Sequence, residues 1–157
     1  MRTPSRKIVL PVALLLIVTI TVLAQHKKSK QRYTICTIKK PQETTLSKSI
    51  SRGAELYTDF CMQCHMTNGK GTPKVFPPLA GSDWLTNKKE ETIHAIKFGI
   101  KGPIKVNGET YNNTMTPLGL EDEEIADIMN YIMNSWGNTQ KKMVTTEEVA
   151  AIKKTNK

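Results

Sequence analysis

The sequence Cys61-Met62-Gln63-Cys64-His65 contains three residues that could together do redox or metal chemistry. Two cysteines three residues apart, followed at once by a histidine, are typical of covalent haem attachment. Each sulfur can add across one vinyl group of haem, and the histidine can then bind the iron as its proximal axial ligand. The motif therefore predicts one haem c, attached through Cys61 and Cys64, with His65 bound to the iron.

Other uses of a C-x-x-C pair fit these surroundings less well. A thioredoxin-like redox pair is expected within a βαβ unit, whereas this pair follows a predicted helix and enters a loop rich in Gly and Pro. A structural zinc site needs a second pair of ligands at metal spacing, and the sequence has none. The third cysteine, Cys36, lies in a basic stretch without an evident partner. We interpret it as a neutral residue, with an intermolecular disulfide as the alternative.

The second axial ligand must come from another segment, and Met115 is the strongest candidate. It lies in the loop that precedes the last predicted long helix, whereas Met62 and Met66 lie beside the motif and Met129 and Met133 lie within that helix. A thioether is a soft, neutral ligand, and His/Met ligation raises the reduction potential of a haem. His94 is the rival ligand, although a helix-borne histidine among lysines and glutamates is usually solvated.

The elements that must position these residues are predicted to be helical. Apolar spacing predicts helices over 53–60, over 87–98 with Asn87 as its N-cap, and over 121–136. Residues 66–85 read as a long loop, and Asn107-Gly108 predicts a small hairpin over 104–111. The segment 51–137 has too few apolar residues for a large core, and a flat apolar haem would complete it. We therefore predict an all-α fold of three or more helices around one haem, with long loops.

Charge divides the chain, whose net charge is +9, into four parts. Residues 1–24, with three basic residues before an apolar run, predict a signal peptide or an N-terminal membrane anchor. Residues 25–49 hold seven Lys or Arg and one Glu, and we interpret them as a basic linker. Residues 50–137 are mildly acidic and would form the domain, and residues 138–157 read as a basic tail outside the core. Nucleic-acid binding is not expected, because that function needs basic residues on the domain with aromatic residues among them.

The segment from about Ser51 to Gly137 resembles the class I c-type cytochromes, and the cytochrome domains attached to some bacterial oxidases and dehydrogenases. Gly53 and Tyr57 stand eight and four residues before Cys61, as in that family, and Ile128 and Tyr131 match its C-terminal helix. The resemblance implies that Gly53 lets these two helices approach closely. It also implies that the carbonyl of Pro78 accepts a hydrogen bond from His65, which would orient the ring.

The resemblance implies an electron carrier rather than an enzyme, because two filled axial positions leave no site for a small-molecule substrate. Its partners would be a redox protein donor and a redox protein acceptor. Haem is joined to cysteines of this family after export, so we expect the domain on the periplasmic side of the cytoplasmic membrane. Two alternatives stay open: the electron-entry subunit of a membrane oxidase or dehydrogenase, and a haem enzyme or gas sensor with an open iron site.

Overall fold

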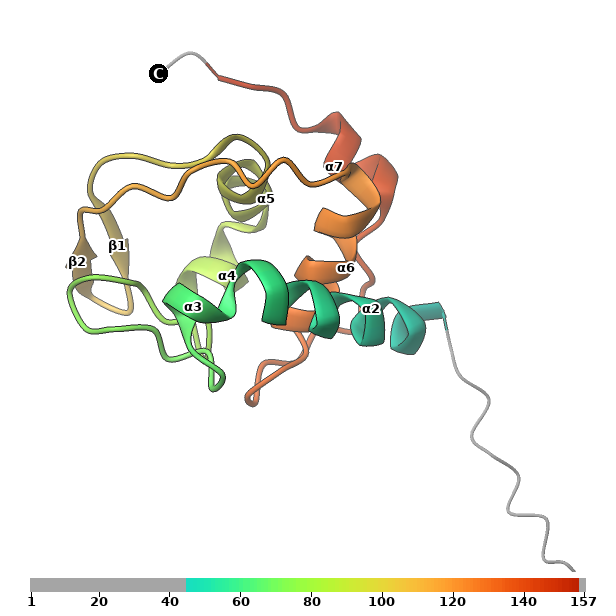
Figure 1. The fold of residues 1–157 in the computed structure, drawn as a ribbon, viewed down its shortest axis with the longest axis horizontal. Helices are drawn as coiled ribbons and strands as arrows, with labels where there is room; N and C mark the ends of the chain where they lie inside the picture. The colour runs from blue at the N-terminus through green and yellow to red at the C-terminus, as the bar shows by residue number, and fades with distance from the viewer. Residues whose placement is uncertain (1–44, 156–157) are drawn as a thin grey trace, which may run out of the picture. The chain divides into compact units, whose positions relative to one another are not determined.

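The computed structural model describes residues 45–155, so the predicted signal peptide or anchor, most of the predicted linker and Cys36 lie outside the described residues. Within 45–155 the chain forms six helices and one two-stranded hairpin, which confirms the predicted all-α class (Figure 1). None of these helices is both long enough and apolar enough to cross a membrane. In chain order the elements are α2 (Thr45–Phe60), α3 (Met62–His65), α4 (Asp83–Asn87), α5 (Lys89–Phe98), β1 (Ile104–Val106), β2 (Glu109–Tyr111), α6 (Asp122–Ile132) and α7 (Thr146–Ala151).

Helices α2 and α6 cross each other at the centre of the core, and Gly53 lies where they meet. A Cβ atom at Gly53 would overlap the carbonyl oxygen of Asp127 and would lie 2.9 Å from the Cβ of Tyr131. Only a glycine therefore allows this approach, as the family resemblance implies. One turn later Tyr57 is buried, with its ring centroid 5.3 Å from that of Tyr131.

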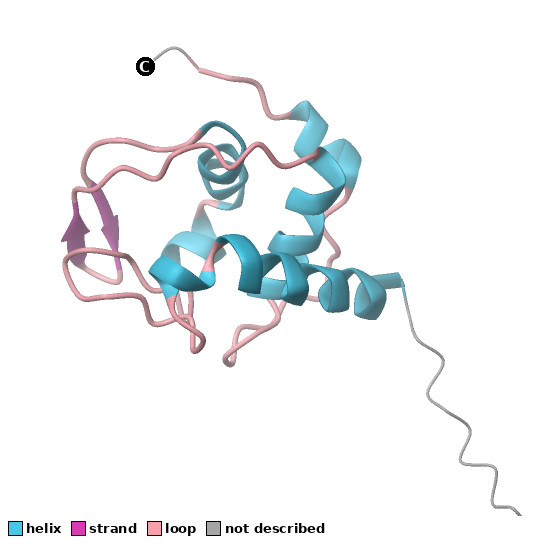
Figure 2. Ribbon diagram, viewed as in Figure 1, coloured by secondary structure: helices cyan, strands magenta, loops and turns pink. Residues whose placement is uncertain are grey.

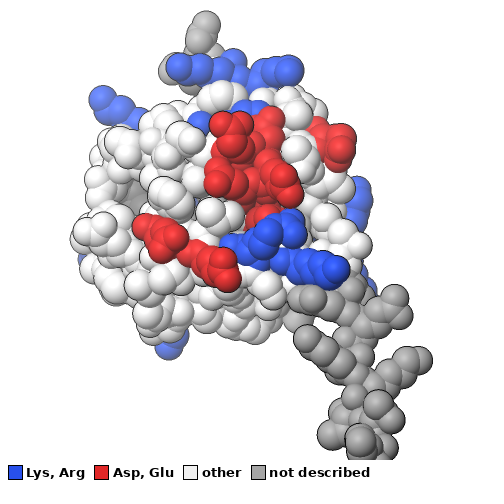
Figure 3. All heavy atoms as spheres, turned by 45° about the vertical axis from the view of Figure 1, so that its right-hand side comes forward, with Lys and Arg blue, Asp and Glu red and all other residues white. Residues whose placement is uncertain are grey.

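The first helix is longer than the sequence predicts, because it begins at Thr45 within the expected linker. Its extra turns are held by polar contacts to α6. Ser49 is fully buried and its hydroxyl donates to the Asp127 carboxylate at 2.6 Å, while Arg52 donates to both oxygens of the same carboxylate. Figure 3 shows acidic side chains gathered over the start of α6, with basic side chains of α2 beside them.

The expectation that residues 138–157 lie outside the core is wrong for residues 138–151. Val144 and Val149 are 0 % exposed and belong to the same core cluster as Tyr57. Helix α7 packs against α6, and Lys97 of α5 donates to the carbonyl of Val149 at 3.1 Å. Two apolar side chains and a few hydrogen bonds suffice to dock this segment, which is why its sequence reads as a tail.

Two helix boundaries also differ from the prediction. Asn87 is the last residue of α4 rather than an N-cap, and Lys88 separates α4 from α5. Helix α6 begins after Glu121 with the capping box that its acidic start favours, but it ends at Ile132. Trp136 therefore lies beyond the helix, with φ of 53°, and its indole N–H donates to the carbonyl of Thr67 at 3.0 Å.

The predicted hairpin is confirmed, with Ile104 opposite Tyr111 and Val106 opposite Glu109. Asn107 and Gly108 have φ of 51° and 84°, the left-handed pair that a tight two-residue hairpin needs. Long loops connect α3 to α4 and β2 to α6 (Figure 2). These loops, the hairpin and α4–α6 enclose the site described next.

Candidate functional site

The three residues of the C-x-x-C-H motif face the same cavity. The chain makes one helical turn here, with the backbone N–H groups of Cys64 and His65 both donating to the carbonyl of Cys61, at 3.2 and 3.0 Å. Residues three and four apart lie on one side of a helical turn. The sequence spacing therefore places both sulfurs and the imidazole on one wall.

The remaining walls of this cavity are almost entirely apolar, and no Asp, Glu, Lys or Arg belongs to its lining. Ile128 and Ile132 of the buried face of α6 form part of it, and the hairpin contributes Val106 and Tyr111. A large flat apolar group with reactive vinyl edges fits such a lining. Further apolar lining residues come from the long loop, from α4 and from α5 and the residues just after it: Val75, Phe76, Pro77, Pro78, Leu79, Trp84, Leu85, Ala95, Ile96 and Ile100.

The His65 ring is oriented by a backbone carbonyl. Its Nδ1 lies 3.0 Å from the carbonyl oxygen of Pro77, so Nδ1 carries the proton and Nε2 keeps the lone pair that a metal ligand needs. Burial lowers the pKa of His65, and the hydrogen bond to Pro77 opposes that shift only in part. The imidazole is therefore neutral near pH 7, as iron ligation requires.

The predicted acceptor, the carbonyl of Pro78, is wrong by one residue. In an extended chain successive carbonyls point in opposite directions, so only one of two adjacent prolines can face the ring. The backbone N–H groups of Leu79 and Ala80 both donate to the carbonyl of Gly69, at 2.7 and 2.9 Å. These hydrogen bonds fix the loop so that the Pro77 carbonyl, and not that of Pro78, faces the ring. Pro78 still lines the cavity.

The electrostatics of the cysteines do not suit a thiol redox pair. Burial, together with the nearby Cys64, raises the pKa of Cys61 to about 11. Thiol oxidoreductases depend on a cysteine whose pKa is lowered. Both cysteines are free, and the residues from 45 to 155 contain no group of three or more His, Cys, Asp or Glu side chains that could hold a metal ion.

Met115 reaches the same cavity from the long loop after the hairpin. Its backbone N–H and carbonyl both pair with Ile100, at 2.9 Å each, so the loop is tied to the end of α5. Gly99 makes this possible: its φ is 80°, and a Cβ there would lie 2.7 Å from the Met115 carbonyl oxygen. His94 does not line the cavity, and its ring contacts Phe98 and Thr155 instead.

Two positioning residues were not found by sequence reasoning. The Asn138 side chain donates to the carbonyl of Leu79 and accepts from the N–H of Gly81, both at 2.9 Å, and so holds the loop that follows Pro77. Trp136 packs against Gly69, where a Cβ would overlap the indole ring. Nothing local marks either residue, because each contacts a segment more than 55 positions away.

The part of the chain that holds these residues is similar in sequence to known proteins. The family model for cytochrome c matches residues 50–136. The chain is 39 % identical to cytochrome c-552 of Thermus thermophilus over 110 residues, which are 64 % of this chain and 83 % of that protein. It is 35 % identical to the gluconate 2-dehydrogenase cytochrome c subunit of Pantoea cypripedii over 106 residues, 65 % of this chain and 24 % of that subunit. It is 34 % identical to the Cbb3-type cytochrome c oxidase subunit CcoP of Rhodobacter capsulatus over 91 residues, 54 % of this chain and 30 % of that subunit.

Proposed function

Since the chain belongs to the cytochrome c family, we propose that it carries single electrons on one haem c, joined to Cys61 and Cys64 and ligated by His65 and Met115. Haem-based electron transfer, by a carrier rather than an enzyme, follows from the family itself. The number of haems, their attachment and the axial ligands are the proposal. The observation that carries it is that both cysteines, His65 and Met115 line one and the same apolar cavity.

When bound, haem supplies an iron that takes up and releases one electron without a change of ligands. The chain's residues would keep that exchange easy. The Pro77 carbonyl holds the His65 ring in one orientation and one tautomer. Gly99 and Ile100 hold the Met115 loop, so the thioether stays in place. The apolar lining, which includes Pro78, keeps water away, and a low-dielectric site with a neutral thioether ligand favours the reduced, less charged iron.

We infer that the chain is exported and acts on the periplasmic side of the cytoplasmic membrane, with residues 1–24 as a signal peptide or an anchor. This rests on the basic start and the apolar run of those residues. N-terminal sequencing and fractionation of the holoprotein test it. A mature chain that begins near residue 25 in the soluble periplasm removes the anchor, and a cytoplasmic holoprotein contradicts export.

A second candidate is the electron-entry subunit of a larger membrane complex. It is favoured by two relatives, one named as the cytochrome c subunit of a gluconate 2-dehydrogenase and the other as a subunit of a Cbb3-type cytochrome c oxidase. The chemistry at the haem would be the same, and only the donor and acceptor would differ. Co-purification of a dehydrogenase or oxidase with the chain from its native membrane would distinguish this candidate from a free carrier.

The axial ligands are tested by spectroscopy of matured holoprotein. Met115→Ala should abolish the weak red band of ferric methionine-ligated haem, lower the reduction potential and admit imidazole to the iron. Met66→Ala is the matched control, because Met66 is 38 % exposed and does not line the cavity. Loss of the band in His94→Ala, with the band intact in Met115→Ala, would move the assignment to His94.

The attachment is tested separately. Cys61→Ser or Cys64→Ser should greatly reduce the yield of holoprotein, because each thioether is one of only two covalent links. Haem that acid acetone extracts freely from the wild-type protein would contradict covalent attachment.

A further inference from the structure

A second groove adjoins the haem cavity on the side of the Met115 loop. The two hollows share a wall formed by Trp84, Ile100, Ile104, Thr114 and Met115. Across the groove stand α5, with Phe98 and His94, and residues 151–155, which follow or end α7. The loop that carries the proposed iron ligand therefore forms one wall of this groove.

The far wall of the groove is held in place by contacts around α7. Lys89 pairs with Glu148 at 3.1 Å, and Lys97 donates to the Val149 carbonyl at 3.1 Å. At the end of this wall the Thr155 hydroxyl lies 3.2 Å from Nε2 of His94. Residues 151–155 lie beyond the segment 50–136 that matches the cytochrome c family, so this wall is an addition to the matched domain.

The added wall makes the groove basic. Residues 45–155 hold thirteen Lys or Arg and thirteen Asp or Glu, so the described part of the chain has no net charge. The groove, in contrast, is lined by four lysines and only two glutamates. Two of these lysines, Lys153 and Lys154, belong to the added wall and are exposed. A third, Lys88, lies 4.4 Å from the centre of the Trp84 ring.

We propose that this groove receives an acidic segment of a protein redox partner, recognised by Lys153 and Lys154 from one side and by the Met115 loop from the other. The proposal rests on the electron-transfer function proposed above. Complementary charge steers encounters and raises association rates while leaving complexes short-lived, which suits an electron carrier. Apolar residues between the charges, among them Phe98, Pro103 and Pro117, offer contact to an apolar side chain of that segment.

The test uses full-length ¹⁵N-labelled holoprotein and a synthetic peptide of alternating Glu and Leu, with binding followed by NMR. The double variant K153Q/K154Q is compared with the control K48Q/K141Q, which removes two lysines that are also exposed but do not line the groove. At about 0.01 M salt, K153Q/K154Q should weaken peptide binding about fivefold, whereas K48Q/K141Q should weaken it less than about twofold. At about 1 M salt the difference should vanish. K154Q alone, which leaves the contact from Lys153 to the Ala150 carbonyl, should give about a twofold loss.

Equal weakening by both variants, or peptide-induced shifts outside the groove, would overturn the proposal. The proposal would also be overturned if the protein bound phosphatidylglycerol vesicles through Lys153 and Lys154 but did not bind the peptide. The groove would then be a lipid contact. Each variant is first checked for its haem spectrum and for reduction by ascorbate. Failure of those checks in the wild-type protein counts against the electron-transfer proposal, whereas a failure of peptide binding alone counts only against the groove.

Discussion

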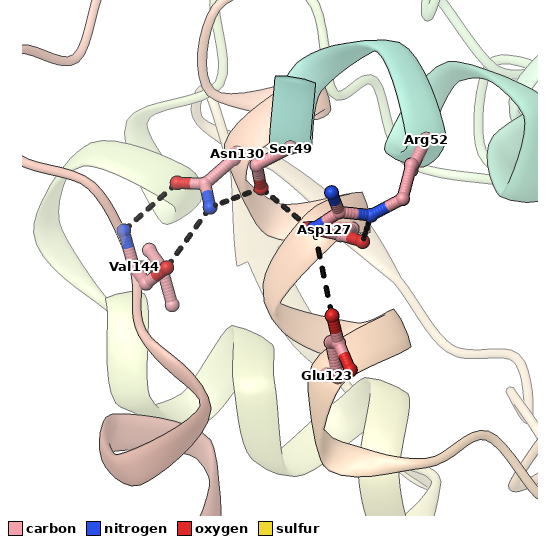
Figure 4. Close-up of polar contacts among 6 residues, drawn as sticks. All are labelled: Ser49, Arg52, Glu123, Asp127, Asn130 and Val144. Carbon is pink, nitrogen blue, oxygen red and sulfur yellow. Dashed lines mark hydrogen bonds and ion pairs between the residues drawn. The ribbon is translucent and has the colours of Figure 1, made fainter. Parts of the chain in front are cut away.

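Replacing Asn130 by alanine should destabilise the protein by about 3 kcal/mol, because this side chain fastens the C-terminal segment to the core. Asn130 is 1 % exposed. Its amide nitrogen donates to the Ser49 hydroxyl at 2.8 Å and to the Val144 carbonyl at 2.9 Å, and its oxygen accepts from the Val144 N–H at 2.8 Å (Figure 4). One side chain thus joins α2, α6 and the segment before α7.

The magnitude follows from what the alanine would leave behind. Val144 is 0 % exposed, so its N–H and its carbonyl would both lose their partner without gaining water. An orphaned buried polar group costs about 1–3 kcal/mol, which gives about 2–6 kcal/mol for the pair. Detachment of the segment would avoid that cost, but it would expose Val144 and Val149, at about 1.5–3 kcal/mol each. The two routes thus cost about 2–6 and about 3–6 kcal/mol, and a loss of about 3 kcal/mol should lower the melting temperature by about 10 °C.

The assay is guanidinium unfolding of the holoprotein, followed by far-UV circular dichroism. Asn87→Ala is the control: Asn87 is exposed at the end of α4, and its loss should cost less than about 0.5 kcal/mol. Trypsin should also cut Asn130→Ala faster than wild type at Lys141 and Lys142, because the segment opens more often. A loss below about 1 kcal/mol, or unchanged trypsin cleavage, would refute the reasoning.

The variant Asn130→Asp separates hydrogen bonding from shape. A carboxylate keeps the acceptor for the Val144 N–H but places negative charge against the Val144 carbonyl and close to Asp127, which shares the Ser49 hydroxyl. The fold would disfavour the ionised form of Asp at position 130, so the pKa of this carboxyl group would be raised. As the pH falls, the carboxyl group regains a proton that it can donate. The variant should therefore gain stability relative to wild type as the pH falls. A stability difference that does not change with pH would show that these donor bonds contribute little.

Three further predictions test the packing of the helices and the Met115 loop. Gly53→Ala should cost at least about 3 kcal/mol in a denaturant titration, because the new methyl overlaps the Asp127 carbonyl and the α2–α6 crossing must open; near-wild-type stability would mean that the helices can separate cheaply. Val149→Ala should cost about 2 kcal/mol by the same measurement, since Val149 is 0 % exposed, whereas the exposed neighbouring change Ala150→Gly should cost about 1 kcal/mol or less. Gly99→Ala should weaken the ferric methionine–iron band, because the added Cβ would lie 2.7 Å from the Met115 carbonyl at a φ of 80°; an unchanged band would argue against this loop as the ligand carrier.

Several features could be predicted from the sequence because they depend on neighbours within a few residues. The turn Asn107-Gly108 needs two left-handed residues, and those two residue types tolerate that conformation at low cost. The C-x-x-C-H spacing by itself places Cys61, Cys64 and His65 on one side of a helical turn.

Other features depended on contacts between distant segments, which no local pattern records. Val144 is buried because Asn130 satisfies both of its backbone groups, and Asn138 joins the core because it binds the carbonyl of Leu79. Pro77 rather than Pro78 faces His65 because the loop is fixed by Gly69, and only one of two successive carbonyls can point at the ring. The sequence by itself determined which residues can attach and ligate a haem. Only the tertiary structure decided which segments enclose them, because burial and long-range hydrogen bonds are properties of the packed chain.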